Sequence, residues 1–159
     1  MGRNLTGWIA EAISTAGGLG HCPVAPGTAG SAGALAVAWP LVHYFGWKPW
    51  YFAVLAAVIL LPSIWAAHRT AHDSGTEDPS KVVIDEVIGQ WITFAATGPY
   101  GWSGWIGAFV LFRIFDIFKP PPVRQAESIP GGAGIIADDV MAGIYGALVL
   151  FTVGCFNFK

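Results

Sequence analysis

Charge is scarce in this sequence. Only 11% of the 159 residues are Asp, Glu, Lys or Arg, whereas about 25% is usual in soluble domains. The net charge is −2, so the chain lacks the basic surface that nucleic-acid binding requires, and we expect no nucleic-acid partner. This length suits one domain and rarely two, so residues 1–159 are predicted to form a single domain.

Soft metal ligands are also few. Cys22 and Cys155 lie far apart and belong to no metal-binding spacing, which excludes a disulfide framework and a cysteine-based zinc site. His68 and His72 have the i, i+4 spacing of metal ligands, but no third nitrogen or sulfur ligand lies near them in sequence. They are interpreted as polar loop residues.

Apolar residues dominate instead. They make up 54% of the chain, with eight Trp and ten Phe, and the mean hydropathy is +0.56, which together indicate an integral membrane protein. The apolar segments predict an all-α, multihelical fold with about five membrane helices. These helices are expected at 28–45, 51–67, 82–96, 102–118 and from about 136 or 138 to 156. A turn at 98–101 joins the third and fourth into a helical hairpin over 82–118.

The N-terminal segment has a different pattern and does not resemble a signal peptide. Its apolar residues recur at helical spacing between Arg3 and Glu11. They are Leu5, Trp8, Ile9, Ala12, Ile13 and Ala16. We predict an amphipathic interfacial helix at the membrane surface, and the same pattern leaves open a helix packed on the rest of the fold.

The distribution of cations predicts the orientation. Five spans place the N-terminus and the loops 68–81 and 119–135 on one side. That side carries Arg3, Arg69, Lys81, Lys119 and Arg124, and the other carries Lys48 and Lys159. The positive-inside rule makes the first side cytoplasmic. Acids from three helix ends then lie at similar depth near the cytoplasmic face, namely Asp85, Glu86, Asp116, Asp138 and Asp139.

These five carboxylates predict a metal site. Without a cation they would repel one another and their pKa values would rise. Mg²⁺ takes oxygen ligands and is commonly held by a few carboxylates together with a substrate phosphate. We therefore expect Mg²⁺ at the five acids, which are also the catalytic candidates. The other acids, Glu11, Glu77, Asp78 and Glu127, are interpreted as solvated surface.

Basic and glycine-rich elements at the same depth predict a phosphate site. Arg113 suits a phosphate by its bidentate geometry and Lys119 as a point charge. The segments 26–28 and 131–134 could aim backbone N–H groups at the same anion, and Thr28 and Ser31 would border the headgroup. The resulting hypothesis is a metal-assisted hydrolase of a phosphorylated lipid, with activated water as the nucleophile.

Simpler explanations stay open for parts of this pattern. Arg113 and Asp116 could form a structural ion pair, Asp138 could be a helix N-cap, and the glycine segments could be ordinary turns. The main alternative function is a cation- or proton-coupled transporter that uses the intramembrane carboxylates, although a transporter is expected to carry them near the bilayer midplane. A non-catalytic scaffold would leave the charges unexplained.

Four segments resemble the bacterial phosphatidylglycerophosphatase A family. They are PGTAGS at 26–31, IDEVIG at 84–89, FRIFDIFKP at 112–120 and GGAGIIADDVMAG at 131–143. The likeness runs in order from about Gly17 to Leu150. The segment HRTAHDSG at 68–75 resembles the loop after the family's second span, and it adds His68 and Asp73 as candidates. The proline run at 120–122 is longer than in the family's motif.

The resemblance implies a multi-pass enzyme of the bacterial inner membrane whose active site faces the cytoplasm. The enzyme would depend on Mg²⁺ and would act on a phosphorylated glycerophospholipid, removing the terminal phosphate of phosphatidylglycerophosphate to give phosphatidylglycerol. The family's acidic positions fall on Asp85, Glu86, Asp116, Asp138 and Asp139, and its basic positions fall on Arg113 and Lys119. The oligomeric state is left open, a homo-oligomer included.

Overall fold

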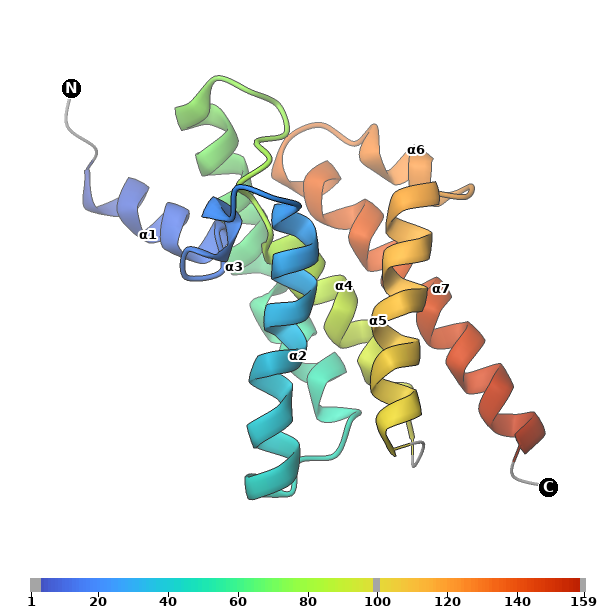
Figure 1. Cartoon of the computed structure of the whole chain (residues 1–159). Coiled ribbons are helices and arrows are strands. Elements are labelled where there is room, and N and C mark those ends of the chain that lie inside the picture. Colours follow the sequence, from blue (N-terminus) through green and yellow to red (C-terminus); the bar gives the residue numbers. More distant parts are fainter. Residues whose placement is uncertain (1–3, 99–100, 158–159) are drawn as a thin grey trace.

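The computed structural model describes residues 4–98 and 101–157, and within these ranges the fold is entirely helical (Figure 1). The elements are α1 (Leu5–Ser14), the 3-10 turn η1 (Leu19–His21), α2 (Pro26–Phe45), α3 (Tyr51–Ser74), α4 (Ile84–Phe94), α5 (Gly101–Phe118), α6 (Val123–Glu127) and α7 (Gly132–Asn157). The predicted all-α fold is confirmed. Of the residues used in the predictions, Arg3, Pro99, Tyr100 and Lys159 lie outside the described residues.

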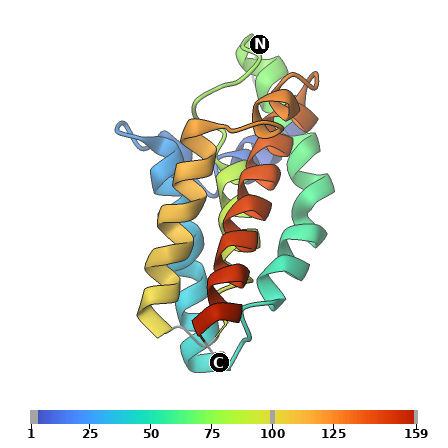
Figure 2. The same cartoon turned by 90° about the vertical axis from the view of Figure 1, so that its right-hand side faces the viewer.

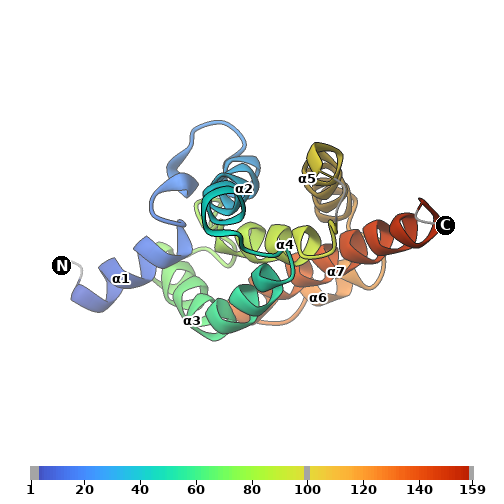
Figure 3. The ribbon, with the colours of Figure 1, turned by 90° about the horizontal axis from the view of Figure 1, so that it is seen from below.

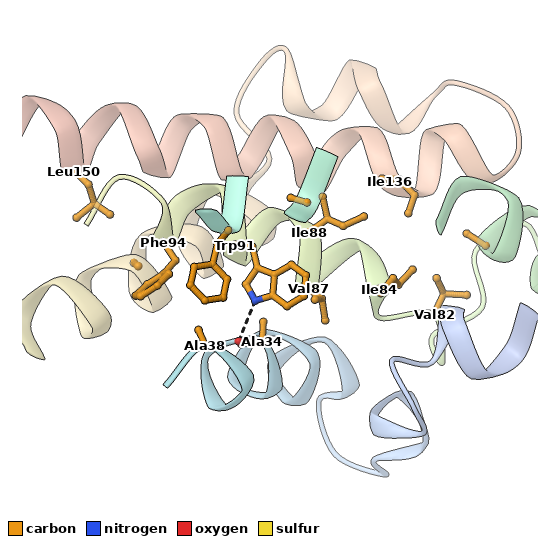
Figure 4. Close-up of a cluster of buried hydrophobic side chains, with 14 residues drawn as sticks. Ala34, Ala38, Val82, Ile84, Val87, Ile88, Trp91, Phe94, Ile136 and Leu150 are labelled. Atoms are coloured by element: carbon orange, nitrogen blue, oxygen red, sulfur yellow. Dashed lines mark hydrogen bonds between the residues drawn. The ribbon is translucent and has the colours of Figure 1, made fainter. Parts of the chain in front are cut away.

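The short helix α4 is the centre of the bundle. It lies between α2, α3, α5 and α7 and contacts all four (Figure 3), and only Glu86 and Ile92 among its residues are not buried. The indole N–H of Trp91 donates to the carbonyl of Ala34 in α2 at 3.0 Å (Figure 4). The hydroxyl of Thr93 donates to the carbonyl of Gly143 in α7 at 3.0 Å. These bonds fix α4 on two sides.

Packing around α4 is aromatic at the end remote from its acids. The ring of Phe94 lies 4.4 Å from that of Trp105 in α5 and 5.3 Å from that of Phe52 in α3. On the α2 side, the fully buried Ala34 and Ala38 face this cluster (Figure 4). Small residues let helix backbones approach closely, so α2 packs tightly on α4 and fixes its position.

Within the described residues, three helices are long and apolar enough to cross a membrane. They are α3, α5 and the part of α7 from Gly132 to Gly154. The predicted count of five is therefore not confirmed. With 11 residues, α4 is only about 16 Å long, about half of a hydrocarbon core of about 30 Å. It cannot be a spanning arm of the predicted hairpin and is instead enclosed by the longer helices.

The N-terminal helix α1 lies at the side of the bundle, next to α3 (Figures 1 and 3). Its buried residues are Gly7, Ala10 and Ser14. The hydroxyl of Ser14 is 2.8 Å from that of Thr70 in α3. Its outward side exposes Leu5, Trp8 and Ile9. The packed alternative is confirmed, and the membrane-surface position stays a prediction that the exposed apolar side supports.

Three helices extend beyond the apolar segments that predicted them. α2 begins at Pro26 instead of Thr28, since proline suits the first helical position. α3 continues past residue 67 and ends before Gly75, whose φ of 70° is left-handed. α7 begins at Gly132, four to six residues before the predicted start, so Asp138 lies inside the helix and is not its N-cap.

These helix directions bring five helix ends together. The beginnings of α2, α4 and α7 and the ends of α3 and α5 all lie at one end of the bundle, the upper end in Figures 1 and 2. The loops that join them lie at the same end. The charged residues near each terminus are thereby gathered in one place.

Candidate active site

A cavity of about 1070 Å³ occupies the end of the bundle where these helix ends meet. Seven of the residues predicted for the site line it, namely Asp85, Glu86, Arg113, Asp116, Lys119, Asp138 and Asp139. The structure therefore brings these seven residues together, as the helix directions predicted. Their individual roles stay predictions.

Three carboxylates form the tightest group in the cavity. The first turn of α4 supplies Asp85 and Glu86, and α7 supplies Asp139, and one oxygen of each lies within 4.8 Å of the others. Asp85 is 8% exposed and Asp139 is 3% exposed. Each of the three has a buried carboxylate oxygen that accepts no hydrogen bond from the described part of the chain. Three such acids so close together need a compensating charge.

A hard divalent cation fits this group. Burial raises the pKa of Asp85 well above its usual value, and the neighbouring charge of Glu86 adds to the rise. Burial also raises the pKa of Glu86. A cation among the oxygens would reverse both effects because it favours the ionised forms. The group consists of carboxylates alone, which is the ligand type that Mg²⁺ prefers.

The other two predicted metal ligands, Asp116 and Asp138, form ion pairs with the basic side chains of the cavity. Nη1 of Arg113 lies 2.6 Å from Oδ2 of Asp116, one turn along α5. Nζ of Lys119 lies 2.8 Å from Oδ2 of Asp138 and 3.2 Å from Oε1 of Glu127. Burial lowers the pKa of Lys119, but the bonds to these two acids outweigh it and raise the pKa above its usual value. Arg113 therefore forms the ion pair with Asp116 that the sequence left open, and it also lines the cavity.

The first turn of α2 approaches the carboxylates directly. A Cβ atom at Gly27 would collide with Oε1 of Glu86 and would lie 3.3 Å from Nη1 of Arg113. Glycine is the one residue without a Cβ, so it allows Glu86 to reach between α2 and α5. The backbone of the predicted glycine-rich segment therefore lies against the acids.

Gly27→Ala is expected to lower turnover by about tenfold to a hundredfold, since displacing a reacting group by about 1 Å can cost that much. The matched control is Gly107→Ala in α5, where the added Cβ would meet only Cδ2 of Leu150, at 3.4 Å. Phosphate release by the two purified variants checks this. Unchanged turnover in Gly27→Ala would show that the position of Glu86 is not required.

Thr28 and Ser31 are not among the residues that line the cavity. Thr28 is exposed and Ser31 is fully buried, and the hydroxyl of Ser31 donates to the carbonyl of Gly27 at 2.9 Å. The early start of α2 places Thr28 in its first turn, away from the cavity wall. Neither residue is placed to border a headgroup there, contrary to the sequence-based expectation.

Of the two candidates from the segment 68–75, only His68 lines the cavity. It lies opposite Gly131, where a Cβ would be 2.7 Å from its Nδ1. Asp73 does not line it and instead lies 3.1 Å from Nε of Arg69 and 3.6 Å from Nδ1 of His72. The resemblance therefore added one residue that the structure places at the cavity.

The sequence interpretation missed Glu77, Asp78 and Glu127, which were read as solvated surface. All three line the cavity. Burial raises the pKa of Asp78, and Glu127 pairs with Lys119 across the proline turn. An isolated acid in a polar loop carries no signal of such a role, because the partner is fixed only by the fold.

These features define a class of protein, a helical membrane enzyme whose acidic cavity, with an arginine and a lysine, suits a phosphorylated substrate. The family model described as Phosphatidylglycerophosphatase A matches residues 12–154. The chain belongs to the phosphatidylglycerophosphatase A family and is a lipid phosphatase. The resemblance seen in the sequence motifs is thus confirmed.

Curated relatives agree with this assignment. Phosphatidylglycerophosphatase A of Escherichia coli is 37% identical over 139 residues, which cover 86% of this chain and 78% of the relative. The protein of the same name from Haemophilus influenzae is 36% identical over 143 residues, 89% of this chain and 85% of the relative. A Bacteroides thetaiotaomicron protein named putative phosphatidylinositol-3-phosphatase is 41% identical over 143 residues, 87% and 89% of the two chains. No solved structure matches this chain significantly.

Proposed function

We propose that the protein hydrolyses the terminal phosphate of phosphatidylglycerophosphate in an Mg²⁺-dependent reaction, giving phosphatidylglycerol and inorganic phosphate. The observation that carries the proposal is the group Asp85, Glu86 and Asp139, with buried oxygens that lack partners within the described residues. The relatives named phosphatidylglycerophosphatase A support the substrate.

The chain's own residues suit distinct parts of this reaction. Asp85, Glu86 and Asp139 would hold the cation, and when bound it would polarise a phosphoryl oxygen and lower the pKa of bound water. Arg113 would bind two phosphate oxygens through its planar fork. Lys119 would add a positive charge that Asp138 holds in place. Negative charge on the phosphate thus meets fixed positive groups at the cavity wall.

We also propose that the protein lies in the inner membrane with the cavity facing the cytoplasm. Arg69, Lys81, Lys119 and Arg124 belong to the cavity end of the bundle, whereas Lys48 lies in the turn at the opposite end. The positive-inside rule places the side with more cations in the cytoplasm. The site would then meet lipid headgroups made on that side.

The direct test uses purified protein in detergent with phosphatidylglycerophosphate. We expect phosphate release with Mg²⁺, loss of release after EDTA, and recovery when excess Mg²⁺ is added back. Release that is absent, or that continues unchanged after chelation, would contradict the proposal. Cation or proton flux without hydrolysis in proteoliposomes would favour the transporter alternative instead.

A second candidate substrate is phosphatidylinositol 3-phosphate. The observation that favours it is the name of the Bacteroides thetaiotaomicron relative, which is 41% identical to this chain. Comparing kcat/KM for the two lipids in the same mixed micelles decides between them. We expect phosphatidylglycerophosphate to be preferred, and a preference for the inositol lipid would change the substrate but not the proposed metal site.

A further inference from the structure

A second hollow lies between α2 and α5, farther along these helices from the charged end of the bundle. It has a volume of about 400 Å³ and is lined by Leu35, Ala36 and Trp39 of α2 and by Trp102, Trp105, Ile106 and Phe109 of α5. We call it the α2–α5 groove. The two helices stand apart on the same side of α4 (Figure 3), and Ile106 and Trp102 are 63% and 65% exposed, so the groove opens to the outside of the bundle.

The groove and the candidate active site lie along the same two helices, α2 and α5. Phe109 precedes Arg113 by one helical turn of α5, a distance of about 6 Å along the axis. On α2, Leu35 follows Gly27 by about 12 Å. Because Glu86 reaches between Gly27 and Arg113, the charged site lies at the head of the same gap between the two helices.

The charged site and the groove together match the depth of one lipid leaflet. The groove itself covers about 10 Å of α5, from Phe109 to Trp102. From Arg113 to Trp102 the axis covers about 16 Å, and half of a hydrocarbon core is about 15 Å. Aromatic rings close the far end. The ring of His43 stacks on Trp39 at 4.6 Å and lies 6.2 Å from Trp102. The groove thus has an apolar wall for an acyl chain. Together with the charged site it has the length that a lipid needs from its phosphate into the hydrocarbon layer.

A buried amide lies one turn of α4 beyond Glu86. Gln90 is fully buried, and neither its Nε2 nor its Oε1 has a hydrogen-bond partner among the described residues. It follows Glu86 by one turn of α4, so both side chains are on the same helix face. Since Glu86 faces α2 and α5, Gln90 lies one turn deeper on that side. An unpaired buried amide is costly, and a polar ligand group would satisfy it.

We propose that the α2–α5 groove binds one acyl chain of the lipid substrate and that Gln90 hydrogen-bonds the glycerol-ester region of the same molecule. The order of groups along a glycerophospholipid is phosphate, glycerol, ester and acyl chain. The order along the gap is Arg113 with the carboxylates, then Gln90, then the apolar wall. The inference rests on the proposed function, because the phosphate bound at Arg113 fixes where the chain enters.

The test fills the groove and compares two substrates. Ala36→Phe places a ring in the groove, and Ala57→Phe is the matched control because Ala57 is an exposed alanine on α3 that does not line the groove. Ala36→Phe is expected to raise the KM for long-chain phosphatidylglycerophosphate by about tenfold or more. It should leave kcat/KM unchanged for glycerophosphoglycerophosphate, the same headgroup without acyl chains. The control should change neither value.

A second variant protects the test against misfolding. Ile106→Trp fills the groove from α5 and should raise the same KM. If both groove variants keep the wild-type KM for the long-chain lipid, or if Ala57→Phe raises it equally, the groove does not hold the chain and the proposal is overturned. Failure of the wild-type protein to hydrolyse either substrate would contradict the proposed function instead.

Gln90→Leu separately tests the proposed hydrogen bond between Gln90 and the ester region of the lipid. It should raise the KM for the long-chain lipid and leave the melting temperature in detergent at or above that of the wild type, because the unpaired amide is removed. The deacylated substrate, which lacks the ester carbonyls, should lose less in kcat/KM than the long-chain lipid. An unchanged lipid KM, or an equal loss with both substrates, would exclude contact between Gln90 and the ester region.

Discussion

Asp85→Asn is expected to reduce phosphate release by at least about a hundredfold while the protein still folds and inserts. The amide keeps the shape of the side chain but removes the charge that would hold a cation among Asp85, Glu86 and Asp139. A bound metal ion is worth several kcal/mol of transition-state stabilisation, and each 1.36 kcal/mol is tenfold in rate. Turnover with saturating Mg²⁺ measures the loss.

Thermal unfolding distinguishes a lost ligand from a damaged fold. Burial raises the pKa of Asp85, so the ionised form is disfavoured in the folded protein, and the neutral amide should not lower the melting temperature in EDTA. Mg²⁺ should then raise the melting temperature of the wild type and raise that of the variant much less, because a ligand stabilises only the state that binds it.

The control for this experiment is Glu11→Gln. Glu11 pairs with Lys81 at 3.1 Å and does not line the cavity, so the substitution removes a partly buried carboxylate without touching the site. It should keep wild-type turnover and the full Mg²⁺ response. If Asp85→Asn retained wild-type rates, Asp85 would have no part in the reaction, and an equal Mg²⁺ response in both variants would place the cation elsewhere.

The convergence of the charged residues could be predicted from the sequence because it depends only on alternating helix directions. Asp85 at the start of one helix, Asp116 near the end of the next and Asp139 near the start of the last must lie at the same end of any antiparallel bundle. This inference does not depend on the number of spans, which is not confirmed. Although α4 is too short to cross a membrane, it still begins at the same end as α2 and α7.

The ends of the helices could not be predicted, because an apolar run and the helix that contains it need not end at the same residue. His68 begins a polar run, but α3 continues for another two turns until Gly75. Gly132 was expected within the loop 119–135, yet it begins α7, and a Cβ there would collide with the carbonyl of Ile64. That glycine allows α7 to approach α3, and such a role appears only when both backbones are placed.

The division of the acids into two groups was equally hidden in the sequence. All five were expected to hold the metal, but Asp116 contacts Arg113 and Asp138 contacts Lys119. The buried Oδ1 of Asp138 has no partner among the described residues, so this acid still has an oxygen to offer. Some of the acids pair with basic side chains and others are free to bind a metal ion. The difference depends on side-chain positions within a few ångströms, which sequence spacing does not determine.

Arg113→Lys tests whether Arg113 binds the phosphate, and it is the second substitution for which we expect a large effect. Lysine keeps the positive charge but lacks the planar fork that binds two phosphate oxygens at once. We expect kcat/KM to fall by about tenfold to a hundredfold, mainly through KM, and Arg113→Ala to lose more. The control is Arg124→Lys, since Arg124 is exposed on α6 and does not line the cavity. Equal kinetics for the two lysine variants would remove Arg113 from the phosphate site.

A double-mutant cycle then assigns Asp116. If Asp116 acts by holding Arg113, Asp116→Asn should cost much less in the Arg113→Lys background than in the wild type, because the two side chains act as one unit. The Mg²⁺ concentration for half-maximal activity should be unchanged by Asp116→Asn alone. If that concentration rises severalfold, and the two substitutions are additive in kcat/KM, Asp116 is a metal ligand, and its contact with Arg113 at 2.6 Å is secondary.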